Sequence, residues 1–245
     1  MTYQPFYIHG EDRPGRWLIT CDHATNTVPP DVNGGDLGLP REDMERHIAY
    51  DVGAYGLAQH LGQLLDSPVI ASNFSRLVID PNRGEDDPTV LMKLYDGTII
   101  PANRYADPAE RERRLAQYYR PYHDQLARMA ALPHAVIVSV HSFTRQLRGR
   151  DPRPWHVGVL HAADTRLSDP LLQLLQAEPD LVVGQNQPYG GHLPGDAIDR
   201  HASAFGRRNV LIELRNDLIA DHHLQHAWAA RLAPILTRAL DLTGL

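Results

Sequence analysis

Two histidines and one glutamate stand where short apolar stretches of the chain end. Histidine nitrogens combined with a carboxylate and an open coordination position are the usual ligands of a catalytic zinc ion. A glutamate beside such an ion is suited to take a proton from water and to pass it to a leaving amine. We therefore expect one metal-dependent catalytic site. The stretches, each with the residue that it leads to, are 17–21 with His23, 135–140 with His141, and 209–212 with Glu213.

All three stretches have the composition of buried β-strands. They are short runs rich in Val, Ile and Leu, which is typical of fully buried strands. In open α/β sheets, ligands bind beyond the carboxyl ends of the strands, so His23, His141 and Glu213 should meet at one rim of one sheet. The simpler alternative is that any α/β protein places polar residues where its strands end. Three such residues together favour a common site.

A third metal ligand should come from a polar residue near the two histidines. Asp51 is the preferred candidate, because it lies near the start of an amphipathic helix predicted over 42–65, on the side of the sheet where the first strand ends. Asp22 and Asn26 are the alternatives. Asp22 would point to the opposite side from His23 if the strand continues that far, and asparagine is a poor ligand for zinc.

Two arginines flank another apolar run, 77–79, which we predict to be a strand. Asp80, Asn82 and Arg83 crowd its carboxyl end, and Arg76 precedes it. The planar guanidinium group of arginine matches the geometry of a carboxylate. One of the two arginines is therefore expected to polarise the carbonyl group of the scissile bond, and the other to bind a carboxylate of the substrate.

The rest of the chain consists of alternating strand and helix patterns, which predicts a single α/β domain over 1–245. Proline and glycine mark a polar segment over 84–107, which we expect to form a flap with a turn at 95–97. Residues 1–16 should be an irregular lead-in. The remaining predicted strands are 69–71, 156–161 and 182–184, and the remaining predicted helices are 108–129, 170–178 and 221–240.

Composition narrows the class of protein. The chain has 245 residues, of which 42% are hydrophobic and 22% charged, as in ordinary globular proteins. The formal net charge is −6 and no block of basic residues is present, so a nucleic acid partner is not expected. Cys21 is the single cysteine, which rules out an internal disulfide and a cysteine-rich zinc site. Neither a signal peptide nor a run of about 20 apolar residues is seen, so we expect a cytoplasmic protein with no membrane partner.

Several short motifs follow one another along nearly the whole chain. They are CDHATN at 21–26, HIAYDVGA at 47–54, SR at 75–76, DPNR at 80–83, HSF at 141–143, DRHA at 199–202 and IELRND at 212–217. In this order the motifs resemble the N-formylglutamate amidohydrolase family, which is similar in turn to zinc carboxypeptidases and aspartoacylases with their Asp-x-Asn-Arg motif. The resemblance implies a doubly wound mixed sheet, mostly parallel, with helices on both faces, of the phosphorylase/hydrolase-like and zinc-carboxypeptidase-like kind. It also implies one Zn²⁺ per chain.

The resemblance assigns roles to the residues of the expected metal site. His23 and His141 match the two histidine ligands, and Glu213 matches the catalytic glutamate. Asn26 stands where the carboxypeptidase-like pattern His-x-x-Glu has its glutamate. Because of this departure, the carboxylate ligand is assigned to Asp51 instead.

The resemblance also assigns roles to the residues that would contact the substrate. Arg76 matches the arginine that polarises the carbonyl group. Asn82 and Arg83 match the pair that binds a carboxylate of the substrate, and Arg200, in the DRHA motif, is added as a further substrate-binding residue. The implied partner is therefore a small molecule that bears a carboxylate.

These features predict a zinc-dependent amidohydrolase that cleaves a linear amide of an N-formyl or N-acyl amino acid, such as N-formyl-L-glutamate, by means of metal-activated water. Another divalent metal would also suit the ligands, since sites built from nitrogen and oxygen discriminate poorly by affinity. The choice of amide should depend on the loops around 84–107, 145–154 and 186–200.

Three alternatives to this function come from the same residues. One is a carboxypeptidase-like or deacylase activity on a different amide. Another is a non-catalytic module that uses its arginines to bind an anionic metabolite. The third, a Cys21 nucleophile with His23 as its base, is the weakest, because most buried cysteines are inert.

Overall fold

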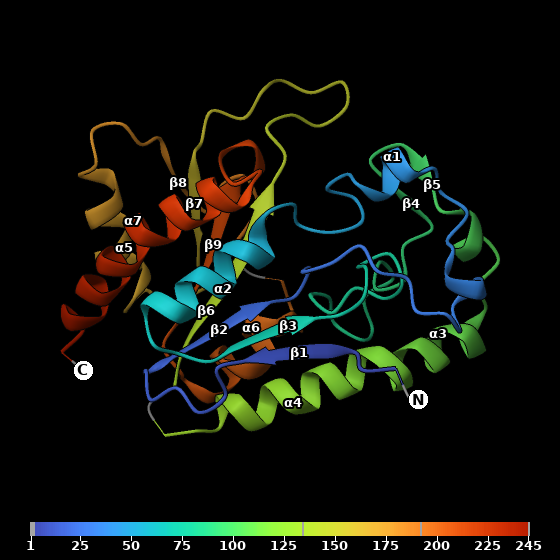
Figure 1. Cartoon of the computed structure of the whole chain (residues 1–245), viewed down its shortest axis with the longest axis horizontal. Helices are drawn as coiled ribbons and strands as arrows, with labels where there is room; N and C mark the ends of the chain where they lie inside the picture. The colour runs from blue at the N-terminus through green and yellow to red at the C-terminus, as the bar shows by residue number, and fades with distance from the viewer. Residues whose placement is uncertain (1–2, 134, 192, 245) are drawn as a thin grey trace.

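A seven-stranded mixed sheet forms the centre of the molecule in the computed structural model, which describes residues 3–133, 135–191 and 193–244. The strand order is β1-β3-β2-β6-β9-β7-β8 (Figure 1). Most neighbours are parallel, but β1 runs antiparallel to β3, and β7 antiparallel to β9. The strands are β1 (Phe6–His9), β2 (Trp17–Cys21), β3 (Val69–Ser72), β6 (Val136–Phe143), β7 (Val157–Leu160), β8 (Val183–Gln185) and β9 (Asn209–Arg215), with β4 (Leu94–Tyr95) and β5 (Thr98–Ile99) in a separate hairpin.

Helices cover both faces of this sheet (Figure 1). α2, α5 and α7 enclose one hydrophobic core with the strands, and α4 and α6 enclose a second core on the other face, so the predicted doubly wound α/β fold is confirmed. No helix in the described part of the chain is long and apolar enough to cross a membrane. The helices are α1 (Arg41–Met44), α2 (Ala54–Leu64), α3 (Pro108–Arg114), α4 (Arg120–Ala130), α5 (Ser168–Gln176), α6 (Ala197–His201) and α7 (His222–Asp241), with short 3₁₀ turns at Asn33–Gly35, Pro101–Asn103, Ser203–Phe205 and Asn216–Leu218.

The central parallel strands bring their carboxyl ends to one edge of the sheet. β6 is paired with β2 on one side and with β9 on the other. Within the β6–β9 pair, His141 is the register partner of Glu213. β2 ends at Cys21, so His23 follows it at the same edge. The three residues expected at one rim are therefore delivered there by three adjacent strands.

The single helix predicted over 42–65 is wrong, because two helices with a turn between them occupy this segment. α1 ends at Met44 and α2 begins at Ala54. Gly53 caps α2 with a φ of 82°, and a Cβ there would lie 2.1 Å from the carbonyl oxygen of Ile219. Only glycine adopts this conformation without strain, so the helix cannot extend backwards through it. Asp51 consequently lies in the turn before α2 and not within the helix.

Two further predictions about the edge of the sheet are wrong. Residues 77–79 form a fully buried turn, not a strand, and the amide of Val78 bonds to the carbonyl of Ser75. The edge position next to β3 is taken instead by β1, from the segment predicted to be irregular. A short apolar run has the same composition in a buried turn as in a buried strand, so composition does not distinguish the two.

The helical segment predicted over 108–129 is present but is not uniform. α3 and α4 are joined by a π-helical turn at Leu115–Tyr119. Pro121 follows this turn, and its missing N–H removes one bond of the regular α-helical ladder, which agrees with the local change of winding. The turn predicted at 95–97 connects β4 to β5, with positive φ at Asp96 (43°) and Gly97 (76°).

Candidate active site

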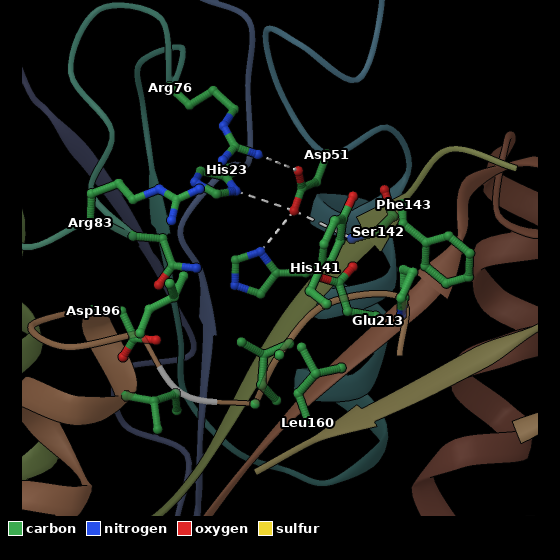
Figure 2. A pocket seen from close by; sticks show the side chains of 18 of the residues that line it. His23, Asp51, Arg76, Arg83, His141, Ser142, Phe143, Leu160, Asp196 and Glu213 are labelled. Atoms are coloured by element: carbon green, nitrogen blue, oxygen red, sulfur yellow. Dashed lines mark hydrogen bonds and ion pairs between the residues drawn. The ribbon is translucent and has the colours of Figure 1, made fainter. Parts of the chain in front are cut away.

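A cavity of about 440 Å³ opens at the edge of the sheet where β2, β6 and β9 end (Figure 2). Of the residues predicted from the sequence, the cavity is lined by His23, Asp51, Arg76, Asn82, Arg83, His141 and Glu213. Arg200 is not among them. Segment 84–107 contributes Tyr95 and segment 186–200 contributes several residues, whereas no described residue of 145–154 lines the cavity. Residue 192, within the second segment, lies outside the described part of the chain.

His23, Asp51 and His141 present three ligand atoms to one point in the cavity. These atoms all lie within 4.8 Å of one another, and the three residues are buried. Oδ2 of Asp51 is 3.3 Å from Nδ1 of His23 and 2.8 Å from Nδ1 of His141. The backbone fixes this arrangement, because the Asp51 amide donates to the carbonyl of His23 at 2.9 Å. The turn before α2 is thereby tied to the end of β2.

A second carboxylate stands behind each histidine. Oδ1 of Asp80 lies 2.7 Å from Nε2 of His23, and Oδ2 of Asp22 lies 3.4 Å from Nε2 of His141. A carboxylate at one ring nitrogen holds the proton there and leaves the other nitrogen free to bind a metal. In both rings this orientation turns Nδ1 toward Asp51.

The alternative ligands Asp22 and Asn26 are placed differently from Asp51. Asp22 faces the far nitrogen of His141 and accepts a hydrogen bond from the Tyr122 hydroxyl. The side chain of Asn26 donates to the carbonyl of Met44 at 2.9 Å, and Asn26 does not line the cavity. Of the three candidates, Asp51 is the one whose carboxylate lies between the two histidines.

The two histidines and the carboxylates determine the charges at this point. Burial by itself would raise the pKa of Asp51, but the charges and hydrogen bonds of His23 and His141 lower it below the ordinary value. Burial would lower the pKa of His141, but hydrogen bonds to Asp22 and Asp51 raise it well above the usual range. Asp51 is therefore an ionised carboxylate, which is the form that binds a cation.

Glu213 is a buried carboxylate without a hydrogen-bond partner for one of its oxygens. The residue is 6% exposed, and among the described residues Oε2 makes no hydrogen bond. Burial, with a further contribution from Asp51, raises the pKa of Glu213 to about 7, although the positive charge of His141 acts in the opposite direction. A carboxyl group that titrates near neutrality is suited to accept and return a proton.

Arg76 and Arg83 both line the cavity, but they differ in how many hydrogen bonds their guanidinium groups make with the protein. The Arg76 guanidinium donates to Oδ2 of Asp80 at 2.8 Å and to Oδ1 of Asp51 at 3.4 Å, and it lies over the ring of Tyr95. Nε of Arg83 lies 3.9 Å from Asp80 and makes no hydrogen bond with a described residue. Arg83 is therefore the arginine whose donors are available to a ligand.

Further cavity residues were not singled out from the sequence. His47 has a buried Nε2 without a hydrogen-bond partner among the described residues, and burial lowers its pKa. Asp196 is 7% exposed, and burial raises its pKa to about 6. His47 belongs to the segment predicted to be helical and Asp196 to a loop, so neither follows an apolar strand. His141 and Glu213 were identified because they stand at the ends of apolar strands, and His47 and Asp196 do not.

Arg200 supports the cavity from outside. Its guanidinium donates to the hydroxyl of Tyr119 and lies 3.9 Å from Glu85. The Tyr119 hydroxyl in turn donates to the main-chain carbonyl of Arg83 at 2.6 Å. Arg200 is thus connected through Tyr119 to the main chain at Arg83, and it does not itself line the cavity.

His201, next to Arg200, is also connected to the DPNR segment through another residue, His123. Nε2 of His201 lies 2.8 Å from Nδ1 of His123, and Nε2 of His123 lies 2.9 Å from the carbonyl oxygen of Pro81. The DRHA motif therefore holds the DPNR segment at two carbonyl groups. Both histidines are deeply buried, and burial lowers the pKa of His201 to about 4.

Cys21 takes no part in the cavity. It is fully buried in the core beneath α2, and burial raises the pKa of its thiol well above the ordinary value. A thiol in this state is not a nucleophile at neutral pH.

The sequence is similar to known proteins along most of its length. Residues 15–220 match the N-formylglutamate amidohydrolase family. An N-formylglutamate deformylase of Pseudomonas aeruginosa is 28% identical over 250 residues, which cover 91% of this chain and 88% of that protein. An N-formylglutamate deformylase of Pseudomonas putida is 28% identical over 207 residues, which cover 75% of this chain and 73% of that protein.

Solved structures show the same fold. The gene product Atu2144 from Agrobacterium tumefaciens superposes with a TM-score of 0.92 at 33% identity, over 99% of this chain and 97% of that one. An N-formylglutamate amidohydrolase from Ralstonia eutropha superposes with a TM-score of 0.72 at 22% identity, over 98% and 97% of the two chains. On the match over residues 15–220, this chain belongs to the N-formylglutamate amidohydrolase family and is an amidohydrolase enzyme.

Proposed function

We propose that this enzyme is a metal-dependent hydrolase of N-formyl amino acids and closely related N-acyl amino acids. The observation that carries the proposal is the convergence of His23, Asp51 and His141 within 4.8 Å, beside the unpartnered carboxylate oxygen of Glu213. Relatives at 28% identity named N-formylglutamate deformylase support the N-formyl group as the part of the substrate that is cleaved.

His23, Asp51 and His141 fit a divalent cation such as Zn²⁺. Two imidazole nitrogens and one ionised carboxylate form a typical set of protein ligands for a catalytic zinc ion. The carboxylates of Asp80 and Asp22 at the far ring nitrogens supply the orientation that such ligands need. A divalent ion bound there would supply a Lewis acid that lowers the pKa of water toward neutrality and polarises a carbonyl group.

Glu213 would move the proton in the reaction. Its carboxylate lies across from His141, so water that attacks the formyl carbon beside the metal ligands is within the reach of Glu213. Glu213 would take a proton from this water and deliver it to the amide nitrogen as the C–N bond breaks, which yields formate and the free amino acid. A pKa of about 7 allows both steps at neutral pH.

Arg83 with Asn82 would bind the α-carboxylate of the substrate. Nε of Arg83 makes no hydrogen bond with a described residue and lies 3.9 Å from Asp80, and Asn82 also lines the cavity. Arg76 would place its positive charge near the carbonyl oxygen, while its hydrogen bonds to Asp80 and Asp51 also orient these two carboxylates. The substrate would then lie between Arg83 and Glu213, with its formyl group at the metal ligands.

The test combines metal analysis with an assay of formate release. Untagged protein purified without added metal should contain about one zinc ion per chain and should release formate from N-formyl amino acids. His141→Ala should lose both properties, whereas Glu213→Gln should keep the metal and lose turnover. His223→Ala, at an exposed position of α7, is the control and should behave as the parent. A parent that has neither metal nor activity after zinc is added, or a fully active Glu213→Gln variant, would contradict the proposal.

A further inference from the structure

The two arginines of the cavity differ in how closely carboxylates hold them. Of the described residues that line it, the cationic side chains are Arg76 and Arg83, and histidines supply the other basic groups. Arg76 donates hydrogen bonds to Asp80 and Asp51, whereas Nε of Arg83 lies 3.9 Å from Asp80 and makes no hydrogen bond with a described residue. Nε2 of His47 already faces the Asp96 carboxylate at 3.5 Å, and burial lowers the pKa of the His47 ring. Within the described part of the cavity, one carboxylate of a substrate can therefore be matched by Arg83, and no second cationic side chain remains for another.

The wall below Glu213 is apolar. Leu211 lies two residues before Glu213 on β9 and so faces the same side of the sheet. Leu160 on β7 is the register partner of Leu211, and both line the cavity. Ile198 and Leu193, from the segment after β8, line the same cavity. Among the described residues, the side chains on this wall are branched aliphatic groups that carry no hydrogen-bond donor.

Asp196 adds a negative group to this region. Asp196 lines the same cavity as Leu160 and Ile198, and Figure 2 shows Asp196 below Arg83 and Leu160 below His141. The Asp196 carboxylate is fixed at the start of α6, where Oδ1 accepts a hydrogen bond from the amide of Asp199 at 2.7 Å. A second carboxylate on the substrate would lie in apolar surroundings near a like charge, and both effects disfavour its ionised form.

We propose that the preferred substrates are N-formyl derivatives of L-amino acids with apolar side chains, and that an acidic side chain such as that of glutamate is disfavoured. This proposal rests on the proposed function and specifies the class of substrate. Leu160, Leu211 and Ile198 contact the side chain, Asp196 repels a second carboxylate, and Arg83 binds the single α-carboxylate.

A preference for acidic side chains would require a second cation in the cavity, and Arg153 is the nearby arginine that could supply it. Its guanidinium lies over the rings of Tyr189 and Phe143, which line the cavity, but Arg153 itself does not line it. It donates to the carbonyl of Thr144 at 3.1 Å and to the hydroxyl of Tyr189 at 3.2 Å. Both bonds come from one nitrogen, Nη1, so binding a second carboxylate in the cavity would require the guanidinium to leave its place over these two rings.

The deciding measurement is kcat/KM for N-formyl-L-leucine and N-formyl-L-methionine against N-formyl-L-glutamate and N-formyl-L-aspartate, on the metal-loaded full chain. We expect the apolar pair to be favoured by at least about tenfold, since one or two groups in an apolar pocket contribute about 10–200-fold. Equal values, or a preference for the acidic pair, would overturn this proposal and leave the proposed function intact. A failure to cleave any of the four would instead contradict the proposed function.

Variants of Asp196 and Arg153 test whether these residues determine the preference for apolar over acidic substrates. Asp196→Asn keeps a good helix cap and removes the charge, so N-formyl-L-glutamate should gain at least about threefold relative to N-formyl-L-leucine. The matched control is Asp107→Asn, which alters an aspartate with the same capping role at the start of α3 and should leave the ratio unchanged. An unchanged ratio in Asp196→Asn would remove Asp196 from the proposal. A preference for N-formyl-L-glutamate that disappears in Arg153→Met would identify Arg153 as the second cation and overturn it.

Leu160→Ala provides an independent readout. This variant should lower kcat/KM for N-formyl-L-leucine by about tenfold and leave N-formylglycine, which has no side chain to place, nearly unchanged. The glycine derivative controls for any general loss of folding. Equal losses for the two substrates would contradict the placement of the side chain against Leu160.

Discussion

His141 and Glu213 are direct register partners on the adjacent parallel strands β6 and β9, and both side chains face the cavity. Neighbouring partners in a parallel pair project to the same side of the sheet, so the pairing holds the imidazole proposed as a metal ligand and a buried carboxylate next to each other. The charge on each group changes the pKa of the other. The pair thus joins the candidate metal site to the group that would transfer the proton.

The first prediction concerns Glu213 in catalysis. Glu213→Gln preserves shape and removes the group that accepts a proton, so kcat should fall by about 10²–10⁴-fold with little change in KM. Steady-state formate release measures both constants. Glu112→Gln, at an exposed position of α3 remote from the cavity, is the control and should keep full activity. A loss confined to KM would mean that Glu213 binds substrate and does not transfer the proton.

The second prediction concerns Glu213 and stability in the metal-free protein. The pKa of Glu213 is raised from 4.5 to about 7 in the fold, so its ionised form opposes folding above about pH 7 and this opposition disappears as the pH falls toward 4.5. With chelator present, Glu213→Gln should therefore be more stable than the parent at pH 8, by up to about 3 kcal/mol, and nearly equal to it at pH 5. Urea unfolding at the two pH values measures the difference. A variant that is equally destabilised at both would contradict the assigned direction of the shift.

The third prediction concerns the carboxylate behind His23. Asp80→Asn should weaken metal binding by about 10–100-fold, because the orientation and basicity of the His23 ring depend on the Asp80 carboxylate at 2.7 Å. Competition with a chelator of known affinity measures the change. Asp87→Asn is the control, since Asp87 bonds locally to Thr89 and does not line the cavity. If Asp80→Asn binds the metal as tightly as the parent, the Asp80 carboxylate does not orient His23 for metal binding, and the prediction is wrong.

The fourth prediction concerns Arg83 and the carboxylate of the substrate. Arg83→Met should raise KM at least about tenfold, equivalent to about 1.4 kcal/mol, and Arg83→Lys should recover only part of this loss, because lysine lacks the planar fork. An N-formyl amino acid amide, which has no carboxylate, is the control substrate and should be hydrolysed equally by parent and variants. A similar loss with the amide would show that Arg83 acts on the fold or on the metal site instead.

The fifth prediction concerns Tyr119 as a link between Arg200 and Arg83. Tyr119→Phe removes the hydrogen bond to the Arg83 carbonyl, worth about 0.5–1.5 kcal/mol, so KM should rise by about two- to tenfold while kcat is unchanged. Arg200→Met should give a similar change, and the double variant should show much less than the sum of the two effects. Additive effects would favour the direct substrate contact that was expected of Arg200 from the sequence.

Local sequence determined the central features of this protein. The apolar runs before His23, His141 and Glu213 are long enough and sufficiently branched to be strands, and strands of a parallel sheet end together, so their convergence follows from chain composition. The helices α5 and α7 lie close to their predicted positions for the same reason, because a periodic apolar pattern is a local property. Motifs spread along the chain were sufficient to identify the family.

Tertiary structure decided the features that depend on contacts between distant segments. The carbonyl of Ile219 leaves no room for a Cβ at Gly53, and the turn that precedes α2 places Asp51 between the two histidines. Arg200 donates to the Tyr119 hydroxyl and does not line the cavity, whereas Asp196 does. The composition of a segment and the spacing of its apolar residues predict whether the segment is buried and whether it is a helix or a strand. They do not predict which distant residues will contact it. The positions of these side chains are therefore decided only when the chain packs.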